Sequence, residues 1–189
     1  MTRPTRMRGD DAPGQERGSS FLTTILVAIV LTALVRLFII DSFEIPSGSM
    51  EQTIRVGDRV IGEKISYLFR SPEVGEIVTF VHERGGETNI LIKRVIATEG
   101  QTVDLRDGVV YVDGIALDEP YTQGLPTYPL QSDDPSIVYP YTVPHGCIFV
   151  MGDNRTNSRD SRAIGPVRVE DVSSHAVIIF WPPEDIATI

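Results

Sequence analysis

The distribution of hydrophobic residues divides the chain into three parts. Residues 21–40, FLTTILVAIVLTALVRLFII, are an apolar run in which Arg36 is the only charged residue. A helix rises 1.5 Å per residue, so a run of this length spans about 30 Å, the thickness of a bilayer's hydrocarbon core. Residues 1–20 are polar and arginine-rich, whereas residues 41–189 alternate short apolar runs with turn residues. The pattern predicts a disordered tail over 1–20, a transmembrane helix over 21–40 and a folded domain over 41–189.

Two other interpretations of the apolar run are open. A buried core helix would have a polar face, which residues 21–40 lack. A cleaved signal peptide would have a shorter apolar region and a cleavage site between small residues, whereas the sequence DSFEIP follows this run. Because arginines precede the run and acidic residues follow it, the positive-inside rule puts the tail in the cytoplasm and residues 41–189 outside. We therefore expect a single-pass protein of the cell membrane, with the lipid bilayer as a partner.

The third part of the chain has the pattern of an antiparallel β domain. Its apolar runs are rich in β-branched and aromatic residues, and Gly, Pro, Asp or Asn bound them. The strands predicted in this way are residues 76–81, 89–97, 102–105, 109–112, 147–151 and 176–181. Asp107-Gly108 and Asp113-Gly114 have the composition of tight hairpin turns. Residues 117–145 hold six prolines and predict an extended excursion. The fold class is mainly β, preceded by one transmembrane helix.

Charge and the reactive residue types narrow the possible functions. The net charge is −9, and residues 41–189 alone carry −11, which argues against nucleic acid as a partner. Cys147 is the only cysteine, so an intramolecular disulfide is excluded. The three histidines are far apart and lack metal-ligand spacing, so we expect no metal and no other cofactor.

A candidate nucleophile lies just after the apolar run, in residues 45–53, IPSGSMEQT. Pro46 and Gly48 constrain the chain around Ser47 and Ser49. Such a turn can expose a hydroxyl and aim backbone N–H groups at one point, as acyl transfer requires. An ordinary serine-containing turn is the alternative.

A candidate base lies in the predicted strand 89–97, NILIKRVIA. Strand alternation puts Lys93 on one face with Leu91 and Val95. Burial among aliphatic residues disfavours the charged form of a lysine and lowers its pKa, which favours a neutral amine that can accept a proton. A lysine that extends to water is the alternative.

A polar segment, residues 151–162, follows the apolar strand 147–151. Its short polar side chains suggest a hydrogen-bonded network over the core. Asp160 can pair with Arg162, and Ser158 can orient an amine. Asp153 can pair with either Arg94 or Arg155. A solvated surface loop is the alternative.

Taken together, these segments resemble the motifs of type I signal peptidases, membrane-anchored serine/lysine endopeptidases. The segments that carry the resemblance are the apolar run, IPSGSM with Thr53, GDRVIGEK (57–64), IKRVIATEGQTV (92–103) and MGDNRTNSRDSR (151–162). The resemblance implies an enzyme that removes N-terminal signal peptides from exported preproteins, after small residues at substrate positions −1 and −3. Residues 110–121, VYVDGIALDEPY, also resemble a hairpin of that family.

The resemblance also implies roles for individual residues. Ser49 is the implied nucleophile, Lys93 its general base and Ser158 the residue that orients the lysine. The backbone N–H of Ser49 and the hydroxyl of Ser47 are the implied oxyanion hole. Structural support is implied for Arg94, Asp153, Asp160 and Arg162. Substrate-binding pockets are implied for Phe43, Ile45, Ile54, Leu91 and Ile92.

The sequence departs from the resemblance in several ways, and other functions are open. One span stands where some members have two, and the short segment between Lys93 and Gly152 predicts that an extra β domain is reduced. The family's endoplasmic-reticulum branch has histidine at the position of Lys93, so a bacterial or organellar membrane is expected. The alternatives are a sortase-like transpeptidase using Cys147 beside His145, a serine/histidine protease, an inactive anchored scaffold that binds exported proteins, and a self-cleaving repressor peptidase.

Overall fold

The computed structural model describes residues 16–189, without the side chains of residues 16–20 and Leu37. The predicted tail over 1–20 therefore lies mostly outside the described residues. The chain divides into two units, Met1–Leu37 and Phe38–Ile189. Helix α1 (Glu16–Phe38) begins five residues before the predicted apolar helix and ends two residues before its predicted end. Among the described residues, no helix is both long enough and apolar enough to cross a membrane.

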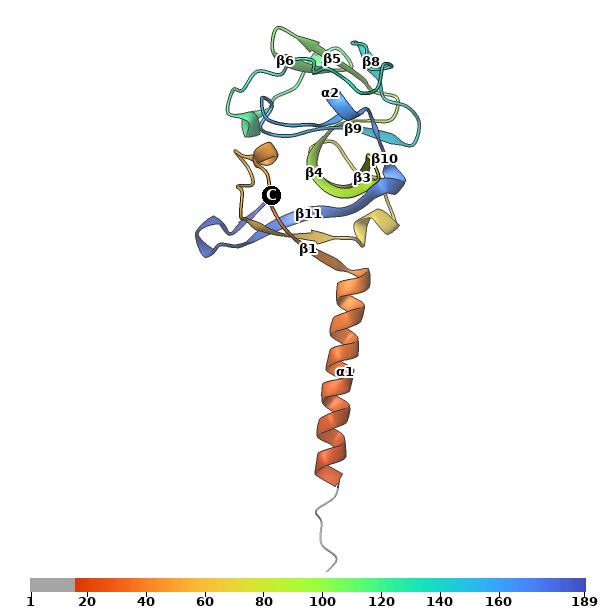
Figure 1. Ribbon diagram of the computed structural model, residues 1–189, viewed down its shortest axis with the longest axis vertical. Coiled ribbons are helices and arrows are strands. Elements are labelled where there is room, and N and C mark those ends of the chain that lie inside the picture. The colour runs from red at the N-terminus through yellow and green to blue at the C-terminus, as the bar shows by residue number, and fades with distance from the viewer. Residues whose placement is uncertain (1–15) are drawn as a thin grey trace, which may run out of the picture. The chain divides into compact units, whose positions relative to one another are not determined.

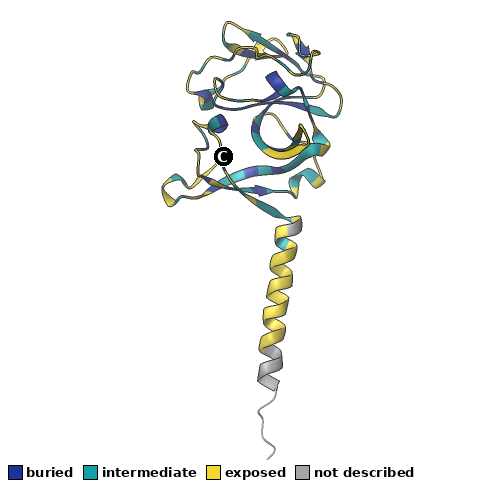
Figure 2. Cartoon of the chain, viewed as in Figure 1, coloured by how far each residue is buried: buried dark blue, intermediate teal, exposed yellow. Residues whose placement is uncertain are grey.

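Apart from Arg36 and three threonines, the described side chains of helix α1 are apolar. Its large side chains from Phe21 to Leu34 are exposed (Figure 2). Thr32 donates a hydrogen bond to the carbonyl of Ala28, one turn earlier, so its hydroxyl is satisfied within the helix. The Thr32 hydroxyl is therefore paired within the helix and needs no partner outside it.

The second unit contains two antiparallel sheets within the described chain. The larger has the order β1 (Ile40–Glu44), β2 (Arg59–Glu63), β11 (Val172–Trp181), β3 (Ile77–Arg84), β4 (Glu87–Thr98), β9 (Cys147–Met151) and β10 (Val167–Arg168), and β12 (Ala187–Thr188) pairs with β11. The smaller has the order β7 (Ile115–Ala116), β6 (Val109–Val112), β5 (Thr102–Arg106) and β8 (Tyr141–Thr142). Figure 1 shows the small sheet beside β9 and the short helix α2 (Ser161–Ile164).

Turn chemistry fixes the register of the small sheet. Asp107 and Gly108 both have positive φ, 52° and 81°, and Asp113 and Gly114 repeat the pattern at 52° and 80°. These are the angles that a two-residue hairpin turn requires. The β5–β6 and β6–β7 hairpins follow directly, as the sequence predicts.

Strand β4 connects the parts of the core. Residues 87–94 of β4 pair with β3, and residues 94–98 pair with β9, with a bulge between Val95 and Ala97. Near the bulge, Ile96 and Ala97 pack with the small sheet, whereas Val95 packs with β3 and β9. Because Lys93 lies next to this junction, the fold itself encloses the lysine.

The mainly antiparallel β fold is confirmed, and each predicted strand is present: β6 and β9 have the predicted ends, and the other four have shifted ends. Strands β1 and β2 were not predicted. Their sequences, IDSFE and RVIGE, mix charged and apolar residues, and they gain their stability from pairing with each other and with β11. The predicted excursion over 117–145 includes strand β8 and the single-turn helix η3 (Pro120–Thr122).

Candidate active site

The single-turn helix η1 (Gly48–Met50) holds the candidate nucleophile. Met50 and Ile54 are fully buried on either side of the turn, so the segment is fixed to the core by its apolar side chains. The Ile54 N–H donates to the carbonyl of Met50, which closes the turn. Ser49 is buried, with 8% of its surface exposed.

Lys93 contacts this serine directly. Its Nζ lies 2.7 Å from Ser49 Oγ and donates to the carbonyl of Ile92 at 2.6 Å, and the residue is 3% exposed. Burial lowers the pKa of Lys93 to about 8, against the opposing attraction of Asp160 and Asp153. Among the described residues, no carboxylate lies within ion-pair distance of Nζ. A hydroxyl in contact with an amine whose pKa is lowered is an arrangement that can transfer a proton from the hydroxyl to the amine.

The polar segment after β9 closes over the pair. Asp153 is fully buried and accepts two hydrogen bonds from Arg94, at 2.9 and 2.7 Å, and one from Thr53 at 2.5 Å. Asn154 donates from its backbone to the carbonyl of Ser49 and from its side chain to that of Gly48. The segment is thus bonded to both the strand of Lys93 and the turn of Ser49, which makes it a structural part of the site.

Asp160 and Arg162 form the second buried ion pair of this segment. The Asp160 carboxylate accepts from Nε and Nη2 of Arg162 at 2.9 Å each, caps the N-terminus of α2 and accepts from the N–H of Gly152. Arg162 also donates to the carbonyl of Arg155. These bonds satisfy a buried carboxylate, which would otherwise be costly. Asp160 is thereby held close enough to influence Lys93.

Two predicted residues have a less direct placement. Ser158 makes no hydrogen bond to Lys93, and its buried Oγ has no partner among the described residues. Ser47 is exposed and makes no capping hydrogen bond to η1. Gly152 lies against both Ser158 and the carbonyl of Ser49, so that a Cβ at Gly152 would collide with them. The predicted roles of Ser158 and Ser47 stay predictions.

A cavity of about 310 Å³ opens between β1 and β4. Its lining residues are Ser42, Phe43, Glu44, Ile45, Pro46, Thr79, Ile90, Leu91 and Ile92. Four of the five predicted substrate-binding residues are among them. Ile54 is not: it is fully buried in an apolar cluster with Met50 and Val60, because its side chain anchors the turn of Ser49.

Three residues outside the predicted site hold the polar segment. Arg155 is buried and pairs with Glu119 at 2.6 Å, and Tyr121 contacts Arg155. The sequence allowed Asp153 to pair with Arg155 or Arg94, and Arg94 is its ion-pair partner. Burial opposes the charge of Arg155, but the hydrogen bonds and attraction of Glu119 outweigh it and raise the pKa. In the sequence, Tyr121 and Glu119 were signalled only by the resemblance of residues 110–121 to a hairpin of the family, which implied no role for either.

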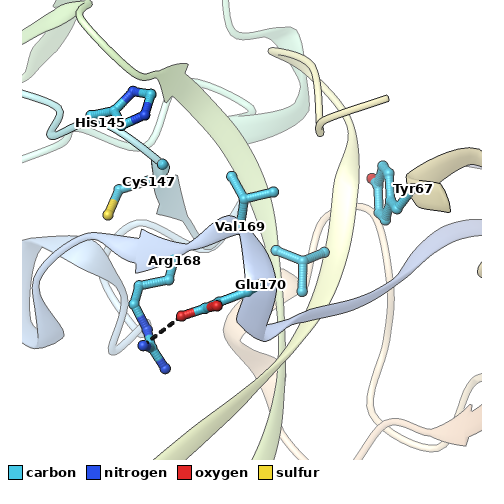
Figure 3. Close-up of a pocket in the computed structure, with 8 residues that line it drawn as sticks. Tyr67, His145, Cys147, Arg168, Val169 and Glu170 are labelled. Atoms are coloured by element: carbon cyan, nitrogen blue, oxygen red, sulfur yellow. Dashed lines mark ion pairs between the residues drawn. The ribbon is translucent and has the colours of Figure 1, made fainter. Parts of the chain in front are cut away.

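The region around Cys147 is different. A cavity of about 600 Å³ is lined there by Tyr67, His145, Gly146, Cys147, Arg168, Val169, Glu170 and Val172. Figure 3 shows the thiol of Cys147 and the imidazole of His145 pointing apart. His145 Nδ1 lies 2.9 Å from a carboxylate oxygen of Glu99, and the His145 side chain is 96% exposed. Burial raises the pKa of the Cys147 thiol. The geometry therefore gives no support to a Cys147–His145 nucleophile.

No group of metal ligands was found among the described residues. The chain was also compared with known proteins. The family described as "Signal peptidase, peptidase S26" matches residues 19–181. The chain is 42% identical to the probable signal peptidase I-1 of Synechocystis sp., over 84% of this chain and 80% of that protein. It is 35% identical to the signal peptidase I of Mycobacterium tuberculosis, over 86% and 72% of the two chains.

Two further similarities cover less of the molecules compared. Thylakoidal processing peptidase 1 of Arabidopsis thaliana is 34% identical, over 94% of this chain and 56% of that protein. A crystal structure of a signal peptidase I from Enterococcus faecalis is 31% identical, covers 56% of this chain and 97% of that one, and has a TM-score of 0.45. The family match and the bacterial relatives confirm the resemblance that the sequence motifs indicate. The chain belongs to the signal peptidase family, peptidase S26, and is a serine endopeptidase of that family.

Proposed function

We propose that this chain is a type I signal peptidase that cleaves N-terminal signal peptides from exported preproteins with Ser49 as nucleophile and Lys93 as general base. The observation that carries the assignment is the 2.7 Å contact between Ser49 Oγ and Lys93 Nζ, with both residues buried. A lysine can act as a base near neutral pH only if its pKa is lowered, and burial supplies that change here.

Acylation begins when the neutral amine of Lys93 takes the hydroxyl proton of Ser49. The Ser49 oxygen attacks the carbonyl carbon of the scissile bond and forms a tetrahedral oxyanion. The backbone N–H of Ser49 and the hydroxyl of Ser47 donate to that oxyanion. The C–N bond then breaks, and the Lys93 ammonium gives its proton to the leaving amine. The mature protein departs, and the signal peptide is left as an ester on Ser49.

Deacylation uses the same lysine. Neutral Lys93 takes a proton from water, the hydroxide attacks the ester, and the ammonium returns the proton to the Ser49 oxygen as the C–O bond breaks. Ser158 is proposed to orient the Lys93 amine during these transfers. Its unpartnered buried hydroxyl is consistent with a hydrogen bond that forms during the reaction.

Substrate is proposed to bind as an extended strand along the cavity between β1 and β4. The first half of β4 pairs with β3 on one side only, since β9 pairs with β4 from Arg94 onward. A free strand edge can accept a peptide by main-chain hydrogen bonds. Phe43, Ile45, Leu91 and Ile92 would then face the substrate side chains, and the small volume of the cavity favours small residues at −1 and −3.

Helix α1 is proposed as the single membrane anchor, with the tail in the cytoplasm and residues 41–189 outside. Its exposed apolar side chains from Phe21 to Leu34 are suited to lipid, and the change from arginines before it to acidic residues after it gives the direction. Anchoring keeps the site at the membrane, where the apolar segment of a signal peptide also lies. The effective substrate concentration rises as a result.

The catalytic proposal is tested with Ser49→Ala and Lys93→Ala in the purified full chain, following preprotein cleavage on gels. Each variant should lose at least about a thousandfold in turnover. Lys64→Ala is the matched control, because Lys64 is the chain's other lysine and pairs with Asp41 instead. Full turnover in Ser49→Ala or Lys93→Ala would contradict the assignment. An acylating active-site inhibitor should label wild type and should not label Ser49→Ala. An inactive scaffold would be labelled in neither protein.

The topology is tested by cysteine labelling in a Cys147→Ser background. A membrane-impermeant maleimide should label Thr88→Cys, in the exposed β3–β4 hairpin, in intact cells. It should label Thr5→Cys, in the tail, only after permeabilisation. Labelling of the tail in intact cells would reverse the proposed orientation.

A further inference from the structure

Resting on the proposed Ser49–Lys93 mechanism, we infer that Tyr121 is a positioning residue for Lys93, because its ring supports the two arginines that hold Gly152 and Asp153 over the catalytic pair. Tyr121 lies in η3, at the start of the excursion and far in sequence from both catalytic residues. It touches neither the cavity between β1 and β4 nor Ser49 or Lys93 through any hydrogen bond found in the described chain.

The first arginine is Arg94, the residue that follows Lys93 in β4. Its guanidinium carbon lies 4.1 Å from the centre of the Tyr121 ring, within cation–π distance. The same guanidinium donates twice to Asp153, and it also donates to the carbonyl of Gly75. Tyr121 therefore backs the group that ties Asp153 to the strand of Lys93.

The second arginine is Arg155, whose guanidinium carbon lies 5.8 Å from the same ring centre. Its Nε donates to the carbonyl of Gly152 at 3.0 Å, and its two terminal nitrogens donate to Glu119 at 2.9 and 2.6 Å. The Tyr121 hydroxyl donates to the same carboxylate at 2.8 Å. One side chain of the excursion thus contacts both cations, and its neighbour Glu119 neutralises the one that is fully buried.

The position of Gly152 and Asp153 matters for Lys93 because Gly152 lies against the carbonyl of Ser49 and the carboxylate of Asp153 attracts the Lys93 charge. Asp153 and Asp160 are the carboxylates that act on Lys93, and Arg94, Arg155 and Arg162 are the cations that face these carboxylates or the adjoining backbone. Removing the ring would leave a space beside Arg94 and Arg155, into which water can enter. Lys93 would then be better hydrated, its charged form would be less disfavoured, and its pKa would rise.

Tyr121→Leu and Tyr121→Phe separate the ring from the hydroxyl. Both variants are measured in the full chain for kcat, KM and the pH dependence of kcat, with Asp133→Asn as a control. Asp133 pairs with Arg159 between the same two segments, but both side chains are exposed. Tyr121→Leu should lower kcat about tenfold, leave KM within about twofold and move the acid limb of the profile to higher pH by about half a unit. Tyr121→Phe and Asp133→Asn should stay within about twofold of wild type.

The pH profile distinguishes positioning from a merely structural role, which would reduce the folded fraction without moving the limb. A wild-type limb in folded Tyr121→Leu overturns the inference, and so does an equal effect in Tyr121→Phe. If Tyr121→Leu does not fold, Arg155→Lys replaces it. That variant keeps a cation beside Glu119, has no planar guanidinium on the ring, and should shift the limb in the same direction. Ser49→Ala in the same assay separates the two proposals, since turnover that survives Ser49→Ala refutes the mechanism itself.

Discussion

Ser49 and Cys147 are two nucleophilic side chains with a possible base nearby, and their surroundings differ in almost every respect. Ser49 lies in a turn whose apolar neighbours are buried, with the Lys93 amine 2.7 Å away. Cys147 begins β9 at the edge of an open cavity, and the nearby His145 is exposed and paired with Glu99 (Figure 3). Burial changes the pKa in both places. It lowers the pKa of the lysine and raises that of the thiol.

In the proposed mechanism, the same physical effect activates one nucleophile and suppresses the other. Desolvation disfavours charge, so it leaves more of a buried lysine in the neutral form that can accept a proton, and it keeps a thiol protonated. At the catalytic pair, the carboxylates of Asp153 and Asp160 are occupied by arginines and do not bond to Lys93. Around Cys147, Arg168 favours the thiolate, but Asp171 and Glu99 oppose it. Activation therefore depends on which type of group is buried and on where the nearby charges are directed.

Outside Ser49 and Lys93 themselves, the largest effect is expected from adding a side chain at Gly152. In Gly152→Ala, the new Cβ collides with Ser158 and with the carbonyl of Ser49, so the turn or the polar segment must move. A shift of about 1 Å at a catalytic group costs on the order of a hundredfold, and kcat for preprotein cleavage should fall by that amount.

Gly146→Ala is the matched control on the Cys147 side. Gly146 has a φ of 70° with no neighbouring atom in the space of a Cβ. This variant should lose about 1 kcal/mol of stability from backbone strain and keep its kcat. Gly152 does not have a positive φ, so equal kcat losses in the two variants would mean that a general loss of stability, and not the collision at Gly152, causes the effect.

The second prediction concerns the stability of the buried lysine. The pKa of Lys93 is lowered to about 8 in the folded state, so the folded state disfavours its charge. That cost is fully present below pH 8 and disappears as the pH rises above the unfolded pKa of about 10.5. The stability of wild type relative to Lys93→Met should therefore increase by about 2 kcal/mol between pH 7 and pH 10, as measured by urea unfolding.

The comparison variant is Lys64→Met, which removes a partly exposed ion pair with Asp41. It should lower the free energy of unfolding by about 1 kcal/mol or less. If the stabilities of wild type and Lys93→Met stay parallel across this pH range, the lowered pKa of Lys93 is refuted.

Much of the fold could be predicted from the sequence, because local chemistry specifies it. The hairpin turns at Asp107-Gly108 and Asp113-Gly114 need positive φ at both residues, and Asp-Gly is a pair that adopts such angles readily. Strands β1 and β2 were not predicted, because IDSFE and RVIGE have no strong alternation of apolar and polar residues. Their stability comes from long-range pairing, which no local pattern encodes.

The individual residues of the candidate site could be predicted from the sequence, but the contacts between distant segments could not. Burial of Lys93 follows from its aliphatic neighbours in the strand, but its contact with Ser49 requires segments 44 residues apart to meet. The partner of Arg155 could not be read from its own segment, since Glu119 belongs to an excursion with little periodic pattern. Ile54 was assigned to a substrate pocket by resemblance; it does not line the cavity between β1 and β4, and its role stays a prediction.

A smaller effect is expected for the reactivity of the Cys147 thiol. Because burial raises its pKa, the thiolate fraction at pH 7.5 is below that of free cysteine. Iodoacetamide should therefore alkylate the folded protein at least about threefold more slowly than the same protein in urea, with the rate rising as the pH approaches the thiol pKa. Faster alkylation in the folded state would show an activated thiol and reopen a role for Cys147.

The smallest effect is expected for Cys147→Ala, which removes the thiol from the comparison altogether. Cys147 packs against the apolar cluster of β4, β5, β6 and β9 but is only partly buried, so losing its sulfur should cost about 1 kcal/mol of stability or less. Preprotein cleavage should stay within about twofold of wild type, because no bond joins Cys147 to Ser49, Lys93 or the polar segment among the described contacts. Thermal unfolding and cleavage rates on the same preparation separate the two effects. A large loss of cleavage with an unchanged melting temperature would indicate catalysis at the Cys147 cavity, and it would contradict the proposal that burial makes Lys93 the base while leaving Cys147 unreactive.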